Sequence, residues 1–293
     1  MKLSSIEIPN TIYTFTEKKN NLSFKVKTAD IDGIQRTLSI KIPEGNYSAS
    51  SLLTELQTQF NTGFRNPYGI FLSVTLDVAT AKISIIHNGL AAYPVVSPTA
   101  TPTASAQPIW FSFEAPTTDG ERNYGLGLGF NLGYRQKCYN ITTPFATSPL
   151  TTYKLVAESC INTVGDNYIF LTINDLHVVD HKTNTDYLQV LAKIIIREER
   201  NAIIFDDGSS CLSNEIIFPS PVDISQFNIK LVDPYGACVD LNGMNFSFTL
   251  EITEVLNTKL YDFYRNYIWS GVLPSVNYKK VEGSAIGLLK GRI

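Results

Sequence analysis

Residues 218–252 read FPSPVDISQFNIKLVDPYGACVDLNGMNFSFTLEI, and this stretch decides the fold class. It contains two runs, 227–232 and 246–252, in which apolar side chains occupy every second position. That spacing predicts β-strands with one face against a core and the other in water. Turn signals at Asp233-Pro-Tyr-Gly236 and Leu241-Asn-Gly243 separate the runs, because proline presets φ and glycine tolerates positive φ. The residues expected on the buried face are Phe227, Ile229, Leu231, Phe246, Phe248 and Leu250.

The rest of the chain shows similar alternation, interrupted by one helical segment. Further strand-like runs lie at 23–27, 38–42, 72–76 and 82–86. Between the second and third of these, Leu52, Leu56 and Phe60 recur at the spacing of one helix face. Because Ser48 is a suitable N-cap and Gly63 a suitable stop, we predict a helix over 49–61. We expect it to plug one end of a β-sandwich or to cover one of its faces.

The composition is that of a soluble globular protein rich in strands. Of the 293 residues, 44% are hydrophobic and 17% are charged, which is typical of a chain with a packed core. Fifteen Tyr and 16 Phe accompany many β-branched residues, and these residue types favour strands. The formal net charge of −3 gives no basic field for wrapping nucleic acid. The apolar runs are too short to span a bilayer.

The N-terminal sequence and the spacing of the cysteines together predict the redox state of the thiols. Residues 1–9 lack the apolar region of a signal peptide. Cys138, Cys160, Cys211 and Cys238 are widely spaced and form no CxxC. We therefore expect reduced, structural thiols.

Two segments rich in Pro and Thr divide the chain. Residues 94–107 (PVVSPTATPTASAQ) carry no charge and cannot bury enough apolar surface to fold alone, so we expect an exposed loop that faces outside or contacts a neighbour. Residues 142–152 have a similar composition, and strand alternation resumes after them. We therefore place a domain boundary near 150 and predict two β-domains, residues 1–148 and 149–262.

Residues 263–293 follow the last predicted strand and combine apolar anchors, four glycines and a mostly basic end. Such a segment can bind a partner by ordering on it, and the ordering cost offsets part of the gain from burial. We predict a C-terminal arm that packs on another subunit; a frayed terminus is the alternative. The expected partner-binding residues are Phe263, Tyr264, Tyr267, Trp269, Leu273, Tyr278, Leu288 and Leu289.

Several of these segments resemble the minor capsid proteins of large icosahedral nucleocytoplasmic double-stranded DNA viruses. Residues 218–252 are similar to a stretch of those proteins, and 166–175 and 190–196 resemble two more strands of the same domain. Residues 38–60 are similar to a strand–turn–helix unit in them. Gly127-Leu-Gly-Phe130 stands where they carry a Leu-Gly-Phe signature.

The resemblance implies a fold and a structural role. The implied fold is all-β, with two jelly-roll-like β-sandwich domains (a double jelly roll), one short helix in the N-terminal domain and a C-terminal arm. The implied function is to bridge or cement capsomers of the major capsid protein, or to occupy the vertex, together with other minor capsid proteins. The protein would belong to the virion shell and assemble in the host cytoplasm. A penton protein and a cement protein stay open, and no enzyme activity, cofactor or metal is implied.

Three patterns in the sequence are candidate sites of chemistry. His177-Val-Val-Asp-His181 has a spacing that could serve metal binding, but it lacks the Glu of HExxH and turn-like residues follow it, which favours an exposed loop. Gly125-Leu-Gly-Leu-Gly129 lacks the context of a phosphate cradle and favours a bend packed against a sheet. His87 precedes Asn88-Gly89, so we expect it in a hairpin.

Two hypotheses from other classes remain. A carbohydrate- or receptor-binding β-sandwich would stack its ligand on exposed aromatic side chains, although aromatic residues in strands more often belong to the core. The candidates for that role are Tyr13, Tyr93, Trp110 and Trp269. A β-sandwich hydrolase would need Asp175, Asp180 and His181 to converge in a pocket.

Overall fold

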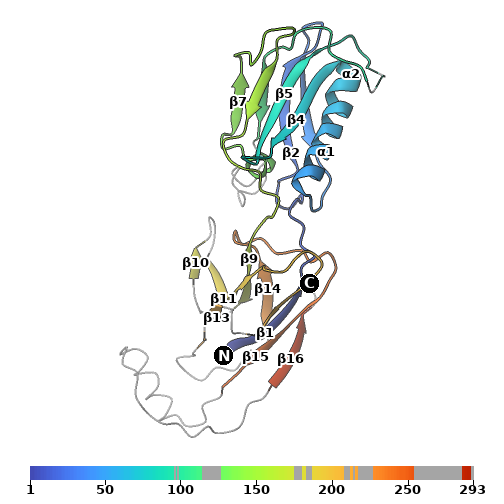
Figure 1. Cartoon of the computed structure of the whole chain (residues 1–293). Coiled ribbons are helices and arrows are strands. Elements are labelled where there is room, and N and C mark those ends of the chain that lie inside the picture. Colours follow the sequence, from blue (N-terminus) through green and yellow to red (C-terminus); the bar gives the residue numbers. More distant parts are fainter. Residues whose placement is uncertain are drawn as a thin grey trace. The chain divides into compact units, whose positions relative to one another are not determined.

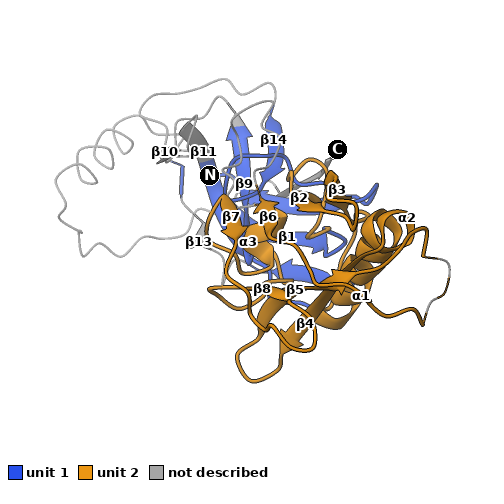
Figure 2. Ribbon diagram, turned by 90° about the horizontal axis from the view of Figure 1, so that it is seen from above, with its two compact units in different colours: residues 1–12, 166–293 blue, residues 13–165 orange. Residues whose placement is uncertain are grey.

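The structure is a computed structural model that describes residues 1–95, 97, 99–113, 127–174, 180–182, 187–207, 212–213, 215–216, 227–253 and 286–291. This part of the chain is mostly β, with four sheets whose strands all pair antiparallel. The chain divides into two compact units, coloured separately in Figure 2. Unit 1 comprises residues 1–12 and 166–293, and unit 2 comprises residues 13–165.

The first strand belongs to a different unit from the one that the sequence predicted. β1 (Lys2–Pro9) pairs with β15 (Phe246–Glu251) and with β12 (Ile203–Asp206), so it completes a sheet of unit 1. A domain of residues 1–148 is therefore wrong at its start. Alternation along a strand reveals which side chains share a face but not which distant strand is its partner.

The expected boundary near 150 is also displaced. Residues 142–152 lie inside unit 2, where Ala146 and Thr152 form an isolated bridge. After them β8 (Tyr153–Val156) pairs with β5 (Lys82–Leu90) in a sheet of the same unit. The Pro- and Thr-rich composition marked a loop, but loops of that composition also connect strands of one domain.

Unit 2 consists of two sheets and a helix around a shared core (Figure 1). The strand orders are β3-β2-β6-β7 and β4-β5-β8. Strands not yet given are β2 (Ser23–Ala29), β3 (Gln35–Lys41), β4 (Ile70–Asp77), β6 (Ile109–Ser112) and β7 (Cys138–Ile141). Val26 and Phe111 from the first sheet and Ile85 from the second belong to one apolar core. Burial of both inner faces in one cluster makes unit 2 a two-layer β structure.

The helix begins where the sequence predicts. α1 (Ala49–Phe60) has Ser48 as its N-cap, whose Oγ accepts a hydrogen bond of 3.1 Å from the backbone N of Ser51. That bond satisfies one of the N–H groups that the first helical turn leaves without a partner. The predicted apolar face is confirmed, because three of its residues are fully buried: Leu52, Leu56 and Phe60.

The helix does not stop at Gly63. It continues through the π-helix η1 (Asn61–Arg65) and through α2 (Asn66–Tyr68), and it ends at Gly69, whose φ of 63° is left-handed. Phe64 extends the buried face into this region and is fully buried. Burial of a phenylalanine is worth more than the modest helix cost of one glycine, so packing carries the helix past Gly63.

The helix α1 covers an open edge of a sheet in unit 2. Gln57 donates from Nε2 to the backbone O of Leu72 at 2.9 Å and accepts at Oε1 from the backbone N of Val74 at 3.2 Å. Both partners lie on β4, which is the edge strand of its sheet. The side chain therefore occupies the hydrogen-bonding positions of a missing neighbouring strand and blocks that edge.

The loop at 94–107 is only partly the exposed excursion that its composition predicts. Val95 and Ala106 are buried. Arg65 holds the loop, donating from Nη2 to the backbone O of Ser97 at 3.0 Å and of Ala100 at 3.3 Å. A polar segment can pack closely when its backbone carbonyls are hydrogen-bonded, and composition alone does not reveal such a partner.

Unit 1 also contains two sheets, with orders β12-β1-β15-β16 and β10-β11-β9-β14; β13 pairs with β11 outside that path. Its remaining strands are β9 (Tyr168–Asn174), β10 (Asp180–Lys182), β11 (Tyr187–Ile195), β13 (Leu212–Ser213), β14 (Asn228–Val232) and β16 (Ile286–Gly291). The predicted parity of 227–232 and 246–252 is confirmed. Four residues of the expected face are buried, Leu231, Phe246, Phe248 and Leu250, and the other two, Phe227 and Ile229, pack against the same core.

Candidate functional site

The predicted partner-binding arm falls mostly outside the part of the chain that the structure describes. Residues 254–285 are not described, and they include Phe263, Tyr264, Tyr267, Trp269, Leu273 and Tyr278. The other two predicted residues, Leu288 and Leu289, lie in β16.

β16 pairs with β15 of the same chain, which modifies the predicted arm. Its register runs from Phe246 opposite Gly291 to Glu251 opposite Ile286, with Leu289 opposite Phe248. The pairing covers every residue of both strands. Residues 286–291 therefore complete a sheet of unit 1 within the chain, where the prediction had them leaving their own domain.

The histidine-containing segment is only partly described. Asp175 and His177 lie outside the described residues. Asp180 and His181 lie in β10, where they oppose Gln189 and Leu188 of β11, so this piece is strand and not the expected loop. The polar residues of this segment show no alternation of apolar side chains, so the sequence did not predict a strand here. Convergence of Asp175, Asp180 and His181 stays an untested hypothesis.

Within the described ranges, no group of three or more His, Cys, Asp or Glu residues could hold a metal ion. Of the helices in those same ranges, none is long and apolar enough to cross a membrane. Three cysteines, Cys138, Cys160 and Cys238, are free thiols, in agreement with the expected reduced state, but they are exposed, which does not fit the expected structural role.

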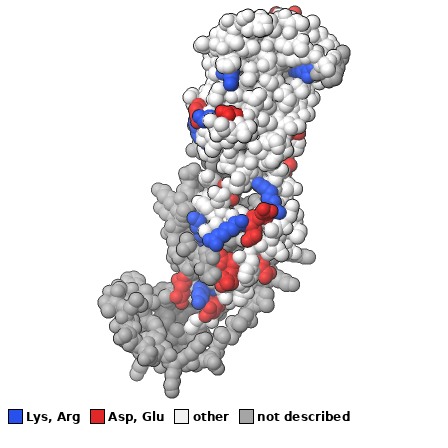
Figure 3. Space-filling model, viewed as in Figure 1, with Lys and Arg blue, Asp and Glu red and all other residues white. Residues whose placement is uncertain are grey.

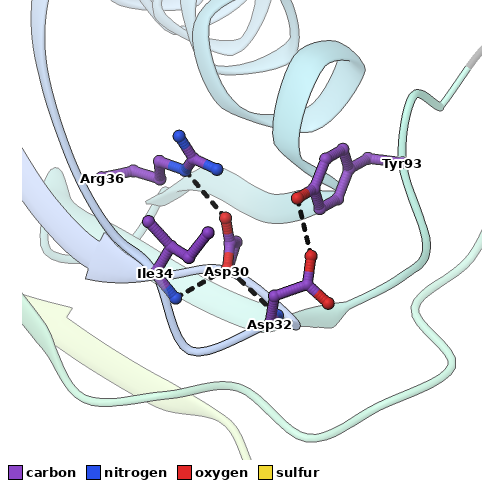
Figure 4. Close-up of polar contacts among 5 residues, drawn as sticks. All are labelled: Asp30, Asp32, Ile34, Arg36 and Tyr93. Carbon is purple, nitrogen blue, oxygen red and sulfur yellow. Dashed lines mark hydrogen bonds and ion pairs between the residues drawn. The ribbon is translucent and has the colours of Figure 1, made fainter.

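A buried carboxylate organises the turn between β2 and β3 (Figure 4). The Asp30 side chain is 0% exposed, and Oδ2 accepts a hydrogen bond of 2.8 Å from Nε of Arg36. Oδ1 accepts from the backbone N of Asp32 at 3.0 Å and of Ile34 at 2.9 Å. Three hydrogen bonds engage both oxygens of this buried carboxylate, so it acts as a clamp for the turn and not as an accessible base for catalysis.

Burial and hydrogen bonding act in opposite directions on the pKa of Asp30. Burial, the largest single effect, raises the pKa of this carboxyl, because it disfavours the charged form. The hydrogen bond from Arg36 and the backbone N–H bonds from Ile34 and Asp32 together outweigh burial and hold the pKa below 3.8. The turn is therefore built around an ionised carboxylate at neutral pH.

Two tyrosines connect the clamp to other parts of unit 2. The hydroxyl of Tyr93 donates to Oδ2 of Asp32 at 2.7 Å, and the guanidinium of Arg36 lies 4.5 Å from the ring centroid of Tyr68 in α2. The helix end, the loop after β5 and the β2–β3 turn are thereby held together. The sequence signal for this cluster was Asp30-Ile-Asp-Gly33, a turn pattern whose partners no local pattern reveals.

His87 lies in a hairpin, as expected, but in a strand of the β4–β5 hairpin and not in its turn. It lies within β5, is 0% exposed, and its Nδ1 is 3.0 Å from the backbone O of Gln107. The register of β4 against β5 skips Asn88, which marks a β-bulge, so Asn88-Gly89 signals a bulge and not a turn. Burial lowers the pKa of the imidazole from 6.5 to about 4, and it therefore stays neutral in the folded protein.

The glycine-rich segment packs as predicted where it is described. Gly127 precedes the short helix α3 (Leu128–Asn131). A Cβ on Gly129 would lie 2.4 Å from the Phe113 ring, so the glycine allows the helix to contact the residue that follows β6. Close packing explains the residue type without a phosphate ligand.

The aromatic candidates for ligand stacking are in different surroundings. Tyr13 is 37% exposed, the Tyr93 hydroxyl is bonded to Asp32, and Trp269 lies outside the described residues. Trp110 is half-buried in β6, between Lys27 of β2 and Asn140 of β7. It is thus the one described candidate placed on a broad sheet face.

Comparison with known proteins finds one distant structural similarity and no matching family. No family model matches the chain, and no curated protein matches it. Among solved structures, the chain is similar to a chain of the 3.5 Å cryo-EM structure of the Sputnik virophage. The two are 14% identical, the match covers 84% of this chain and 79% of that one, and the TM-score is 0.30. A TM-score this low does not establish a shared fold.

Proposed function

We propose that this protein is a structural component of a viral capsid, of the minor capsid type. The proposal begins from the sequence segments that resemble such proteins. These segments fall on framework elements of the described structure, among them β14, β15, β9, β11 and α1. The resemblance therefore concerns residues that build the two β units, which suits a role in assembly.

The observation that carries the proposal is the pairing of β16 with β15. Residues 252–285 separate the two strands, far more than the two to five residues of an ordinary hairpin. A strand on so long a connection is not forced onto the sheet of its own chain. The same backbone hydrogen bonds form when the strand comes from a neighbouring molecule.

Exchange of β16 between molecules would reconcile the observed pairing with the arm that the sequence predicts. Within one molecule, the connection keeps β16 at a high effective concentration near β15. In a shell, neighbours are held side by side, so the exchanged strand would meet comparable conditions. Residues 263–278 would then cross from one subunit to the next.

The finer features of the proposal follow the resemblance. Each unit would be a jelly-roll-like sandwich, and the partners would be the major capsid protein and other minor capsid proteins in the virion shell. A penton role and a cement role differ in symmetry position. Density for the chain on a five-fold axis supports the first, and density between capsomers supports the second.

Strand exchange is tested by mixing two singly substituted chains. Thr249 and Leu288 are directly opposite across β15 and β16. Opposed residues of antiparallel strands are about 4.5–5.5 Å apart, which is within reach of a disulfide. In a background with all four native cysteines replaced by serine, Thr249→Cys protein is mixed with Leu288→Cys protein under mild oxidation, and a covalent heterodimer is expected.

The control mixture contains Lys25→Cys and Ser39→Cys proteins, which are opposed in β2 and β3. Those strands are joined by a short turn, so no heterodimer is expected. Equal yields from both mixtures, or none from either, would contradict exchange. The capsid role has a separate test, namely mass spectrometry of purified virus particles, and absence of the chain from them would contradict it.

A further inference from the structure

The outer face of the sheet β3-β2-β6-β7 carries lysines and one tryptophan but no carboxylate. Alternation along the four strands defines the members of this face, named the lysine face from this point. They are Ser23, Lys25, Lys27, Ala29, Gln35, Thr37, Ser39, Lys41, Trp110, Ser112, Cys138 and Asn140, of which Ala29 and Ser112 are buried.

The absence of acidic residues from the lysine face contrasts with the whole chain, which has 27 Asp and Glu against 24 Lys and Arg. Uncharged residues make up most of the surface of unit 2 that faces the reader in Figure 3. Lys41 bonds Glu17, which is not on the face, at 3.0 Å. Lys25 and Lys27 are exposed, and their ammonium groups have no hydrogen-bond or ion-pair partner among the described residues.

The register places the tryptophan beside a lysine and between polar side chains. One row across the sheet runs Thr37, Lys27, Trp110, Asn140. Neighbouring strands are about 4.8 Å apart, so this row spans roughly the width of two sugar rings. Lys25 lies two residues along β2 on the same face, about 7 Å from Lys27.

We propose that the lysine face binds an anionic glycan, that is, a sulfated or carboxylated oligosaccharide. One sugar ring would lie on the partly exposed indole of Trp110. Its acidic groups would meet the ammonium groups of Lys25 and Lys27. The hydroxyl of Thr37 and the amide of Asn140 supply hydrogen bonds to ring hydroxyls on either side. This site is independent of the capsid role proposed above.

A single-stranded nucleic acid is the competing ligand, and the face fits it less well. Proteins that bind single strands offer several stacking platforms along a basic groove. The lysine face offers one indole on an open sheet. Its other groups are hydroxyls and amides. These groups match the hydroxyls of a sugar better than they match the phosphate that each nucleotide of a single strand carries.

Binding is measured by calorimetry with a heparin octasaccharide as the probe and neutral dextran as its uncharged counterpart. Lys25→Ser/Lys27→Ser should weaken heparin binding about tenfold, because each exposed charge pair contributes on the order of 1 kcal/mol or less. Trp110→Thr should weaken it by a similar factor. The matched control is Lys82→Ser/Lys154→Ser, which removes the same charge from the other sheet and should leave the affinity unchanged.

The thiol of Cys138 reports binding at the face itself, because it is exposed and opposes Ser112 in the register. In a variant that retains Cys138 alone, saturating heparin octasaccharide should slow alkylation of the thiol. In a variant that retains Cys160 alone, which lies outside the face, alkylation should not change.

Three results would overturn the proposal. The first is equal weakening by the two double-lysine variants, which would mean that net charge and not this face is recognised. The second is binding of neutral dextran as tight as that of heparin. The third is tighter binding of an oligo(dT) than of heparin with the same Cys138 protection, which would assign the face to nucleic acid.

Discussion

Arg36 donates a 2.8 Å hydrogen bond from Nε to a carboxylate of Asp30 that is completely excluded from solvent, although the Arg36 side chain itself is 26% exposed. The asymmetry matters for stability. Loss of the arginine leaves a buried charge without its partner, whereas loss of the aspartate leaves a cation that water can still reach. By this criterion, removal of the Arg36 guanidinium destabilises the turn between β2 and β3 more than removal of the Asp30 charge.

Asp30→Asn should destabilise unit 2 by about 2–3 kcal/mol, the range for loss of hydrogen bonds to a charged group. Urea unfolding followed by intrinsic fluorescence gives the free energy. Asp32→Asn is the matched control, because its carboxylate is on an exposed residue and, among the residues that the structure describes, only the Tyr93 hydroxyl donates to it from another segment. A larger loss in Asp32→Asn than in Asp30→Asn would show that the clamp is misassigned.

The same variant has a pH signature. The folded pKa of Asp30 lies below its ordinary value of 3.8, so the folded state binds this proton less readily than the unfolded state. The stabilising contribution is therefore complete above the unfolded pKa and is lost as pH falls through the folded pKa. The difference in unfolding free energy between wild type and Asp30→Asn should be constant from pH 5 to 7 and shrink below about pH 4. A difference that grows on acidification would contradict the sign of the shift.

Titration of His87 should reduce the stability of the fold at a higher pH than titration of Asp30 does. Its folded pKa of about 4 lies below the ordinary 6.5, so between these values the unfolded chain binds a proton that the folded protein does not. Stability should fall as pH decreases from 6.5 to 4, by about 3 kcal/mol from this group, at 1.36 kcal/mol per pKa unit. His87→Asn removes the titration and should flatten the slope over that window. An unchanged slope would mean that other groups cause the acid sensitivity.

Local patterns in the sequence predict the elements well and their partners poorly. The faces of 227–232 and 246–252, and the start of α1 at Ser48, follow from periodicity and capping, which depend only on near neighbours. The pairing of β1 with β15 joins positions more than 200 residues apart, and no short-range pattern encodes it. The Asp30–Arg36 clamp was missed for the same reason, since its burial depends on α2 and on the loop that carries Tyr93.

Gly69 and Gly33 form a matched pair of left-handed glycines. Gly69 has φ of 63°, and a Cβ there would lie 2.0 Å from the backbone O of Ala91. Gly33 has φ of 77°, with no atom within 4 Å of an added Cβ. Gly33→Ala should cost about 1–2 kcal/mol from backbone strain alone, and Gly69→Ala should cost at least about 3 kcal/mol, because the backbone must also move. Similar losses in thermal or urea unfolding would show that the end of α2 is less tightly packed than the structure has it.

The register of β15 gives the last prediction. Phe248 is 3% exposed within the core of unit 1, whereas Thr249 is on the opposite face and opposes Leu288 of β16. Phe248→Ala should destabilise unit 1 by about 3–5 kcal/mol, since it removes a buried ring and leaves a cavity, and much of the protein should become insoluble on expression. Thr249→Ala should cost less than about 1 kcal/mol, because it removes one methyl and a hydroxyl from a half-exposed position of a strand. Chemical denaturation with separate transitions for the two units measures both effects. Near-wild-type stability of Phe248→Ala together with a large loss in Thr249→Ala would mean that the strand is shifted by one residue, and every pairing of β15 with β1 and β16 would then be wrong.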